Sequence, residues 1–150
     1  MGDAAQHKTM TRGAIKWLLS KIKARGLKPE YTFTTSGADG LFETIRFPDT
    51  KVQISCAWKG INTAIASAWG SGYINADRIT VGDWNQPFSD SSKLVVVATV
   101  TPATSGTDCW LSTVTPANIK SAGQYHLVRH TAANAKETFY VNVIAIGTYE

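Results

Sequence analysis

Hydrophobic and polar residues follow two different periods along this chain. Near the N-terminus, Ile15, Leu18, Leu19 and Ile22 recur at the i, i+3, i+4, i+7 spacing of an amphipathic helix. Capping and stop residues place this helix at about residues 11–26. About four turns with an isolated apolar stripe are marginal alone in water. We therefore expect the stripe to pack against the rest of the chain, a copy of itself or another protein.

From about residue 41 onward, β-branched and aromatic runs alternate with turn residues. Such runs are typical of antiparallel strands joined by turns. Seven strands are predicted, over residues 41–47, 51–58, 78–82, 93–100, 109–113, 125–130 and 138–147. Within 51–58 and 138–147 apolar and polar residues alternate, so each strand should turn one face towards a core. The range 60–72, rich in Ala, Ser and Gly, fits either a short helix or a loop.

These patterns predict a mainly β chain in two parts. Residues 1–30 should form an N-terminal tail and a basic amphipathic helix for anchoring or oligomerisation, and residues 31–150 an antiparallel β-sandwich. The run 94–98 is apolar on both faces of its predicted strand. A strand of this kind needs cover from the helix or from another subunit. The run therefore favours oligomerisation.

The positive charge is concentrated at the N-terminus. Residues 1–30 contain seven Lys or Arg against two Asp or Glu, whereas the whole chain carries a formal net charge of +4. Residues 31–150 are therefore close to neutral. They offer no basic groove for nucleic acid, and we expect no nucleic-acid partner.

Length and composition fit one folded domain. The chain has 150 residues, of which 43% are hydrophobic and 17% charged, which excludes a wholly disordered protein. No run approaches the ~18–20 apolar residues that cross a bilayer, so no membrane insertion is expected. The polar start, residues 1–10, lacks the features of a secretory signal, and we expect synthesis in a cytosol.

The chemistry-bearing residues predict no catalytic site, no metal site and no cofactor. The chain has neither a GxSxG elbow nor a GxxxxGK[ST] loop. His126 and His130 lie four apart in a predicted strand, about 13 Å from each other, which is too far to share a metal ion. Cys56 and Cys109 form no CxxC pair. Two buried free thiols are favoured over a disulfide, which the spacing alone does not exclude.

Aromatic residues carry more information. They lie at predicted strand ends and in loops, where a ring either caps the core or stacks on a ligand: Trp58, Trp69, Tyr73, Trp84, Phe88 and Trp110. The loop 82–88 combines aromatic rings with carboxylate and amide groups, the mixture that a sugar-binding surface needs. Its predicted ligand-binding residues are Asp83, Trp84, Asn85, Gln86 and Phe88.

The C-terminal strand 139–147, with its ending Ala145, Ile146 and Gly147, resembles the closing strand of H-type-lectin-like β-sandwich domains. Such domains occur in snail and slime-mould lectins and at the ends of bacteriophage tail and virion proteins. The family's opening strands are similar to the upstream segment that contains Ile45, Phe47 and Pro48 and the strand 52–54. Its central hairpin is similar to residues 72–74 together with 79–81. The chain departs from the family where Val143 replaces the usual Trp.

The resemblance implies a small sandwich that assembles into trimers or hexamers, with ligand sites near subunit boundaries. We therefore expect a non-enzymatic bacteriophage virion structural protein, a homotrimer in the tail or capsid, assembled in the cytoplasm of a bacterial host. Its partners would be other virion proteins and host-surface carbohydrate. The alternative is a stand-alone carbohydrate-binding lectin module without a virion role. A hydrolase is the third and least favoured class.

Overall fold

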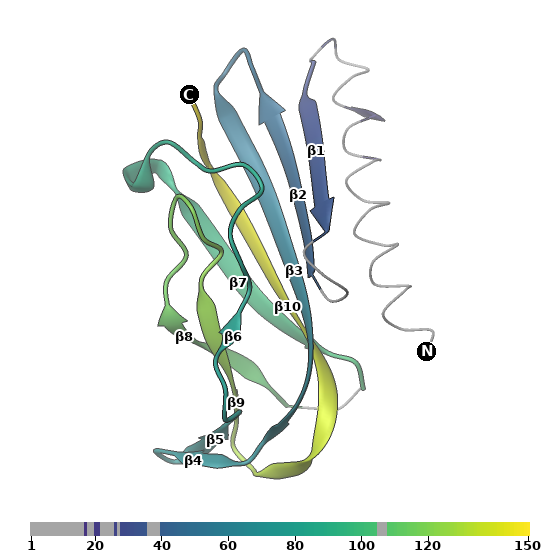
Figure 1. The fold of residues 1–150 in the computed structure, drawn as a ribbon, viewed down its shortest axis with the longest axis vertical. Helices are drawn as coiled ribbons and strands as arrows, with labels where there is room; N and C mark the ends of the chain where they lie inside the picture. The colour runs from purple at the N-terminus through teal and green to yellow at the C-terminus, as the bar shows by residue number, and fades with distance from the viewer. Residues whose placement is uncertain (1–16, 18–19, 22–25, 27, 36–39, 105–107) are drawn as a thin grey trace.

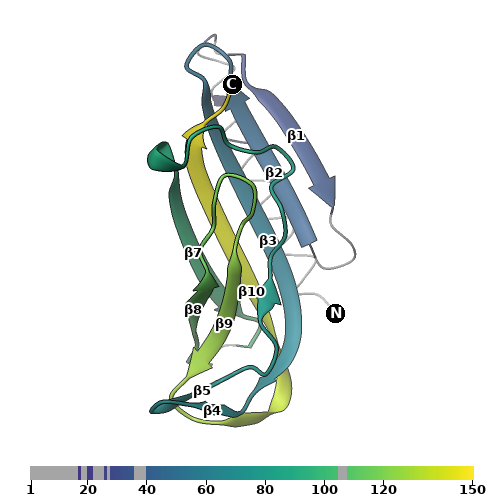
Figure 2. The ribbon, with the colours of Figure 1, turned by 60° about the vertical axis from the view of Figure 1, so that its left-hand side comes forward.

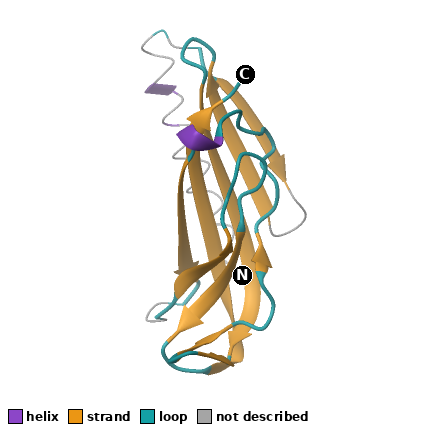
Figure 3. Cartoon of the chain, turned by 90° about the vertical axis from the view of Figure 1, so that its left-hand side faces the viewer, coloured by secondary structure: helices purple, strands orange, loops and turns teal. Residues whose placement is uncertain are grey.

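Two antiparallel β-sheets lie face to face in this computed structural model, which describes residues 17, 20–21, 26, 28–35, 40–104 and 108–150 (Figure 1). The strands are β1 (Glu30–Thr35), β2 (Gly40–Phe47), β3 (Val52–Ile65), β4 (Ser67–Trp69), β5 (Gly72–Ile74), β6 (Ile79–Thr80), β7 (Val95–Pro102), β8 (Trp110–Thr115), β9 (Gln124–Arg129) and β10 (Ala133–Thr148). A short 3-10 helix, η1 (Ser91–Lys93), precedes β7 (Figure 3).

The first sheet has the strand order β1-β2-β3-β10-β7. Its centre is the long ladder between β3 and β10, which pairs Thr148 with Val52 at one end and Glu137 with Thr63 towards the other. Strand β7 pairs with β10 alone, so it forms an edge of this sheet within the described residues.

The second sheet is built around β9. Strands β5 and β6 pair with one side of β9, one after the other, and β8 pairs with its other side. Strand β4 extends the sheet beyond β5 as a hairpin that turns at Gly70. Figure 2 shows this smaller sheet lying across the long strands of the first.

The core lies between the sheets and follows the period-2 alternation of the strands. On β10, Phe139, Val141 and Val143 point inward, and Leu127 and Tyr125 of β9 meet them from the second sheet. Complete burial of each such aliphatic or aromatic side chain contributes about 1.5–3 kcal/mol. Residues from both sheets belong to one hydrophobic cluster, so the two sheets share a single core as in a β-sandwich.

The structure confirms the mainly β, antiparallel class and places a strand at each of the seven predicted positions. The range 60–72 contains no helix: β3 continues through it to Ile65 and β4 follows, and the predicted loop is confirmed only as the turn at Gly70 and Ser71. Strand β1 was not predicted. The predicted pairing of 72–74 with 79–81 is wrong, because β5 and β6 both pair with β9 rather than with each other.

The predicted N-terminal helix falls almost wholly outside the described residues, and all four residues of its stripe, Ile15, Leu18, Leu19 and Ile22, do so. Its role in anchoring or oligomerisation therefore stays a prediction. Across the described part of the chain, no helix is both long enough and apolar enough to cross a bilayer.

Candidate functional site

The loop 82–88, predicted to bind a ligand, closes one end of the sandwich. Trp84 is 5% exposed and Phe88 is 3% exposed. The Trp84 ring meets Phe42 and Phe88 edge-on, at centroid distances of 6.4 and 5.7 Å. Its Nε1–H donates to the carbonyl oxygen of Asn118 at 2.8 Å. Neither Trp84 nor Phe88 thus offers an exposed ring face for stacking on a sugar.

The polar residues of the same loop bond mainly to the inner face of the first sheet. The Oγ1–H of Thr44 donates to Asn85 Oδ1 at 2.6 Å. The carbonyl oxygen of Gln86 accepts from Gln53 Nε2 at 2.7 Å. Asp83 is exposed and forms an isolated β-bridge with Ser121. Of the five predicted ligand-binding residues, only Asp83 is therefore fully at the surface.

A second group of aromatic residues lies at the surface instead. Trp69, at the end of β4, is 50% exposed, and Trp110, at the start of β8, is 38% exposed. They line a groove of about 280 Å³ together with 70–72, Val128 and His130. We call this the tryptophan groove. The sequence placed both residues at strand ends but gave no sign that these rings, rather than Trp84, remain exposed.

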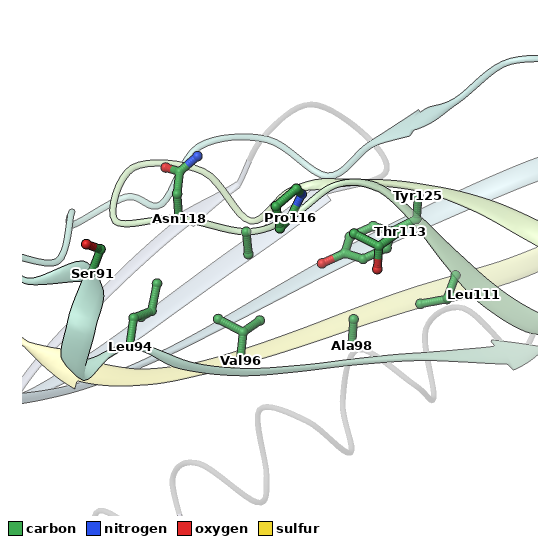
Figure 4. Close-up of a pocket in the computed structure, with 10 residues that line it drawn as sticks. Ser91, Leu94, Val96, Ala98, Leu111, Thr113, Pro116, Asn118 and Tyr125 are labelled. Atoms are coloured by element: carbon green, nitrogen blue, oxygen red, sulfur yellow. The ribbon is translucent and has the colours of Figure 1, made fainter.

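A larger cleft, of about 450 Å³, opens between the edge strands β7 and β8 (Figure 4). Leu94, Val96 and Ala98 point into it from the β7 side, and Leu111 faces them from β8. Tyr125 lies at its back, where burial raises the pKa of the phenol. The aliphatic residues of the lining pack against the hydrophobic core, and polar Ser91, Thr113 and Asn118 also line the cleft.

The outer face of the first sheet carries an apolar cluster that we call the valine–isoleucine patch. Val95 and Val97 of β7 are 64% and 56% exposed, and Ile144 and Ile146 of β10 are 48% and 45% exposed. The register places Val97 opposite Ile144 and Val95 opposite Ile146, so the four side chains are contiguous. One face of the predicted two-sided apolar strand thus lies open in the described structure.

Among the residues that the structure describes, the histidines and cysteines form no shared site. His126 Nδ1 lies 3.3 Å from Asn75 Oδ1, and the ring of His130 lies tilted by 52° against the ring of Trp110, with centroids 4.7 Å apart. Within the described residues, no three His, Cys, Asp or Glu side chains gather as metal ligands would. Cys56 and Cys109 are both free thiols.

We expect both thiols to react slowly in the folded protein. Burial raises the pKa of Cys56 and of Cys109 from 9.0 to about 11. At pH 8 a disulfide reagent should modify them far more slowly in the native than in the denatured chain, because the thiolate is the reacting form. Rapid release of two equivalents from the native protein would contradict this.

The same shifts predict a loss of stability at alkaline pH. Because the unfolded thiols ionise first, their contribution is complete below about pH 9 and disappears as the pH rises to about 11. Denaturant unfolding of wild type and Cys56→Ala at pH 8 and pH 11 should show a smaller loss in the variant. An equal loss in both proteins would contradict the assignment to Cys56.

Comparison with known proteins assigns no family, since no protein-family model and no curated protein matches the chain. Two solved structures resemble it. A C-terminal fragment of the P. aeruginosa R1 pyocin fibre matches 84% of this chain at 16% identity and a TM-score of 0.41, and the chain spans 30% of that fragment. An N-truncated R1-type pyocin tail fibre matches 86% of this chain at 17% identity and a TM-score of 0.41, over 94% of its own length.

The solved structures that this chain resembles are thus pyocin tail fibres. TM-scores below 0.5 do not establish a common fold, so we base the proposed function on the residues of this chain.

Proposed function

We propose that this chain is a non-enzymatic structural protein of a bacteriophage virion, in the tail or capsid, that assembles as a homotrimer. The observation that carries the proposal is the exposed valine–isoleucine patch. The resemblance of 139–147 to H-type-lectin-like domains supports the virion context and the threefold symmetry.

The patch has the chemistry of a contact between identical copies. Side chains near a rotation axis meet their own counterparts, so a charge there would repel itself. Val95, Val97, Ile144 and Ile146 carry no charge, and contiguous exposed aliphatic side chains are costly to leave in water. Three copies of the patch around an axis would bury these side chains together.

The strand that carries the two valines also has an open edge. Natural edge strands usually carry Lys, Pro or bulges that prevent pairing with another chain. Strand β7 contains no charged residue, and its single proline is the last residue, Pro102. An uncharged eight-residue edge of this kind is an aggregation hazard in a monomer, and an assembly would cover it.

The variant Val97→Lys should convert the assembly to monomers. A lysine at this position would bring three ammonium groups together at the centre of the proposed interface, where their desolvation and repulsion oppose association. Sedimentation velocity should then show a species of 16.2 kDa. The matched control, Thr80→Lys on the exposed face of β6, should assemble as wild type does. An assembled Val97→Lys would exclude the patch as the interface.

The virion assignment is tested on purified particles of the phage that encodes this chain. Mass spectrometry should detect the chain in multiple copies, and immunogold labelling should place it at a fixed position on the tail or capsid. Its absence from particles that are otherwise complete would contradict the proposal.

A stand-alone lectin is the second candidate, and the tryptophan groove favours it. A lectin without a virion role would bind a glycan but be missing from the particles. A virion protein whose head contacts host glycans would be present in the particles, so the same preparation separates the two candidates.

A further inference from the structure

We propose that the tryptophan groove binds a neutral saccharide. This inference deepens the proposed function, because it names the surface through which the β-sandwich head would contact host glycans. It also moves the predicted sugar contact from the loop 82–88, which follows β6, to the β4–β5 hairpin at the other end of β9.

The groove is held by the strand ladders of the second sheet. Trp110 pairs with Val128 of β9, and Val128 pairs on its other side with Ile74 of β5. Trp69 pairs with Gly72 across the β4–β5 hairpin. The two indoles therefore reach the groove from strands on opposite sides of β9, and backbone pairing fixes both positions before any ligand arrives.

The exposure of these two rings distinguishes them from the other described tryptophans of the sandwich. Trp58 and Trp84 are 6% and 5% exposed, whereas Trp69 and Trp110 are 50% and 38% exposed beside one hollow. An exposed indole presents a broad apolar face with a polar N–H at its edge. A sugar ring has the complementary surface, with axial C–H groups on its face and hydroxyls around its rim.

No Asp, Glu, Lys or Arg side chain lines the groove. Ser71 and the imidazole of His130 line the groove, and neither takes part in a side-chain hydrogen bond among the described residues. Arg129, next in sequence to the lining residue Val128, forms an ion pair with Glu137 at 3.5 Å. A lining with hydroxyl and imidazole partners but without Asp, Glu, Lys or Arg favours a neutral saccharide over an anionic glycan or a charged peptide.

Size and position agree with this ligand. The hollow of about 280 Å³ lies near the lower end of the range for small-molecule pockets, which suits one sugar ring. The β4–β5 hairpin lies at the end of the molecule opposite the C-terminus (Figure 1). Ile146 lies near the C-terminal end of β10, so assembly through the valine–isoleucine patch would leave the groove open.

The test is binding of the full chain to an array of neutral mono- and oligosaccharides, with sialylated and sulfated glycans as the charged comparison set. The tightest neutral glycan is then titrated by calorimetry into wild type, Trp69→Ala and Trp110→Ala. Each variant should weaken binding by about tenfold or more while its thermal unfolding stays close to wild type. The matched control Val114→Ala, an exposed β8 residue outside the groove, should bind as wild type does.

Two results would overturn the inference. One is wild-type protein that binds no neutral glycan. The other is binding that survives both tryptophan variants, which would place the site elsewhere. Both results leave the proposed structural role intact, because self-assembly and presence in particles are measured independently. A chain that is monomeric and absent from particles would instead contradict the proposed function, whether or not the array detects glycan binding.

Discussion

Replacing Trp84 with alanine should lower the free energy of unfolding by about 3–5 kcal/mol, the usual cost of truncating a fully buried Trp. The ring fills the end of the sandwich between Phe42 and Phe88, so its removal leaves a cavity that these rings cannot close. The substitution also removes the donor to the Asn118 carbonyl, which holds the neighbouring loop. Denaturant unfolding followed by circular dichroism measures the loss.

The same substitution at an exposed ring is the matched control. Trp69→Ala should change the free energy of unfolding by no more than about 1 kcal/mol, because half of its surface is already in water. Together the variants separate two roles of tryptophan: Trp84 should matter for stability and Trp69 for glycan binding. Equal stability losses at the two positions would contradict the assignment of Trp84 to the core.

Gly123→Ala should destabilise the protein by more than about 2 kcal/mol. Gly123 has a φ of +92°, which a residue with a Cβ adopts only with strain. An added Cβ would lie 2.9 Å from the Thr115 carbonyl oxygen and 3.0 Å from the Ala117 nitrogen, both backbone atoms that cannot swing away. The carbonyl oxygen of Gly123 also accepts from the N–H of Val81, so a shift of Gly123 would disturb the chain directly after β6.

Gly70→Ala isolates the conformational part of this cost. Gly70 has a φ of +58°, but an added Cβ there would meet no atom within 4 Å. The free energy of unfolding should therefore fall in Gly70→Ala only by the strain of the left-handed backbone, about 1 kcal/mol. Thermal unfolding of both variants gives the comparison. If Gly123→Ala cost no more than Gly70→Ala, the close backbone approach at Gly123 would not be a real constraint.

Strands could be predicted where the alternation of buried and exposed positions also appears as an alternation of apolar and polar residues in the sequence. Strand β10 alternates buried residues with half-buried or exposed ones along 141–146, and its sequence shows part of this pattern where Phe139, Val141 and Val143 alternate with Tyr140 and Asn142. Strand β1 was missed although Tyr31 and Phe33 alternate with polar residues within Glu30–Thr35, because the segment is only six residues long and its pairing with β2 is a contact outside the segment itself. The end-to-end placement of β5 and β6 on β9 is a long-range choice that short segments do not encode.

The tryptophans show the same limit of what short segments of sequence encode. The sequence predicts that Trp69, Trp84 and Trp110 lie near strand ends, but which ring is covered depends on partners distant in the chain. Trp84 is buried because the Asn118 carbonyl, 34 residues away, receives its N–H and Phe42 packs on its ring. Trp69 has no comparable cover and remains exposed. Composition of a loop therefore indicates a candidate binding surface only after packing is known.

Multi-angle light scattering of the 150-residue chain measures its assembly in solution. We expect a stable species of three times the chain mass of 16.2 kDa over a wide concentration range, formed through the valine–isoleucine patch. A monomer at every concentration, with Val95, Val97, Ile144 and Ile146 left in water, would contradict it.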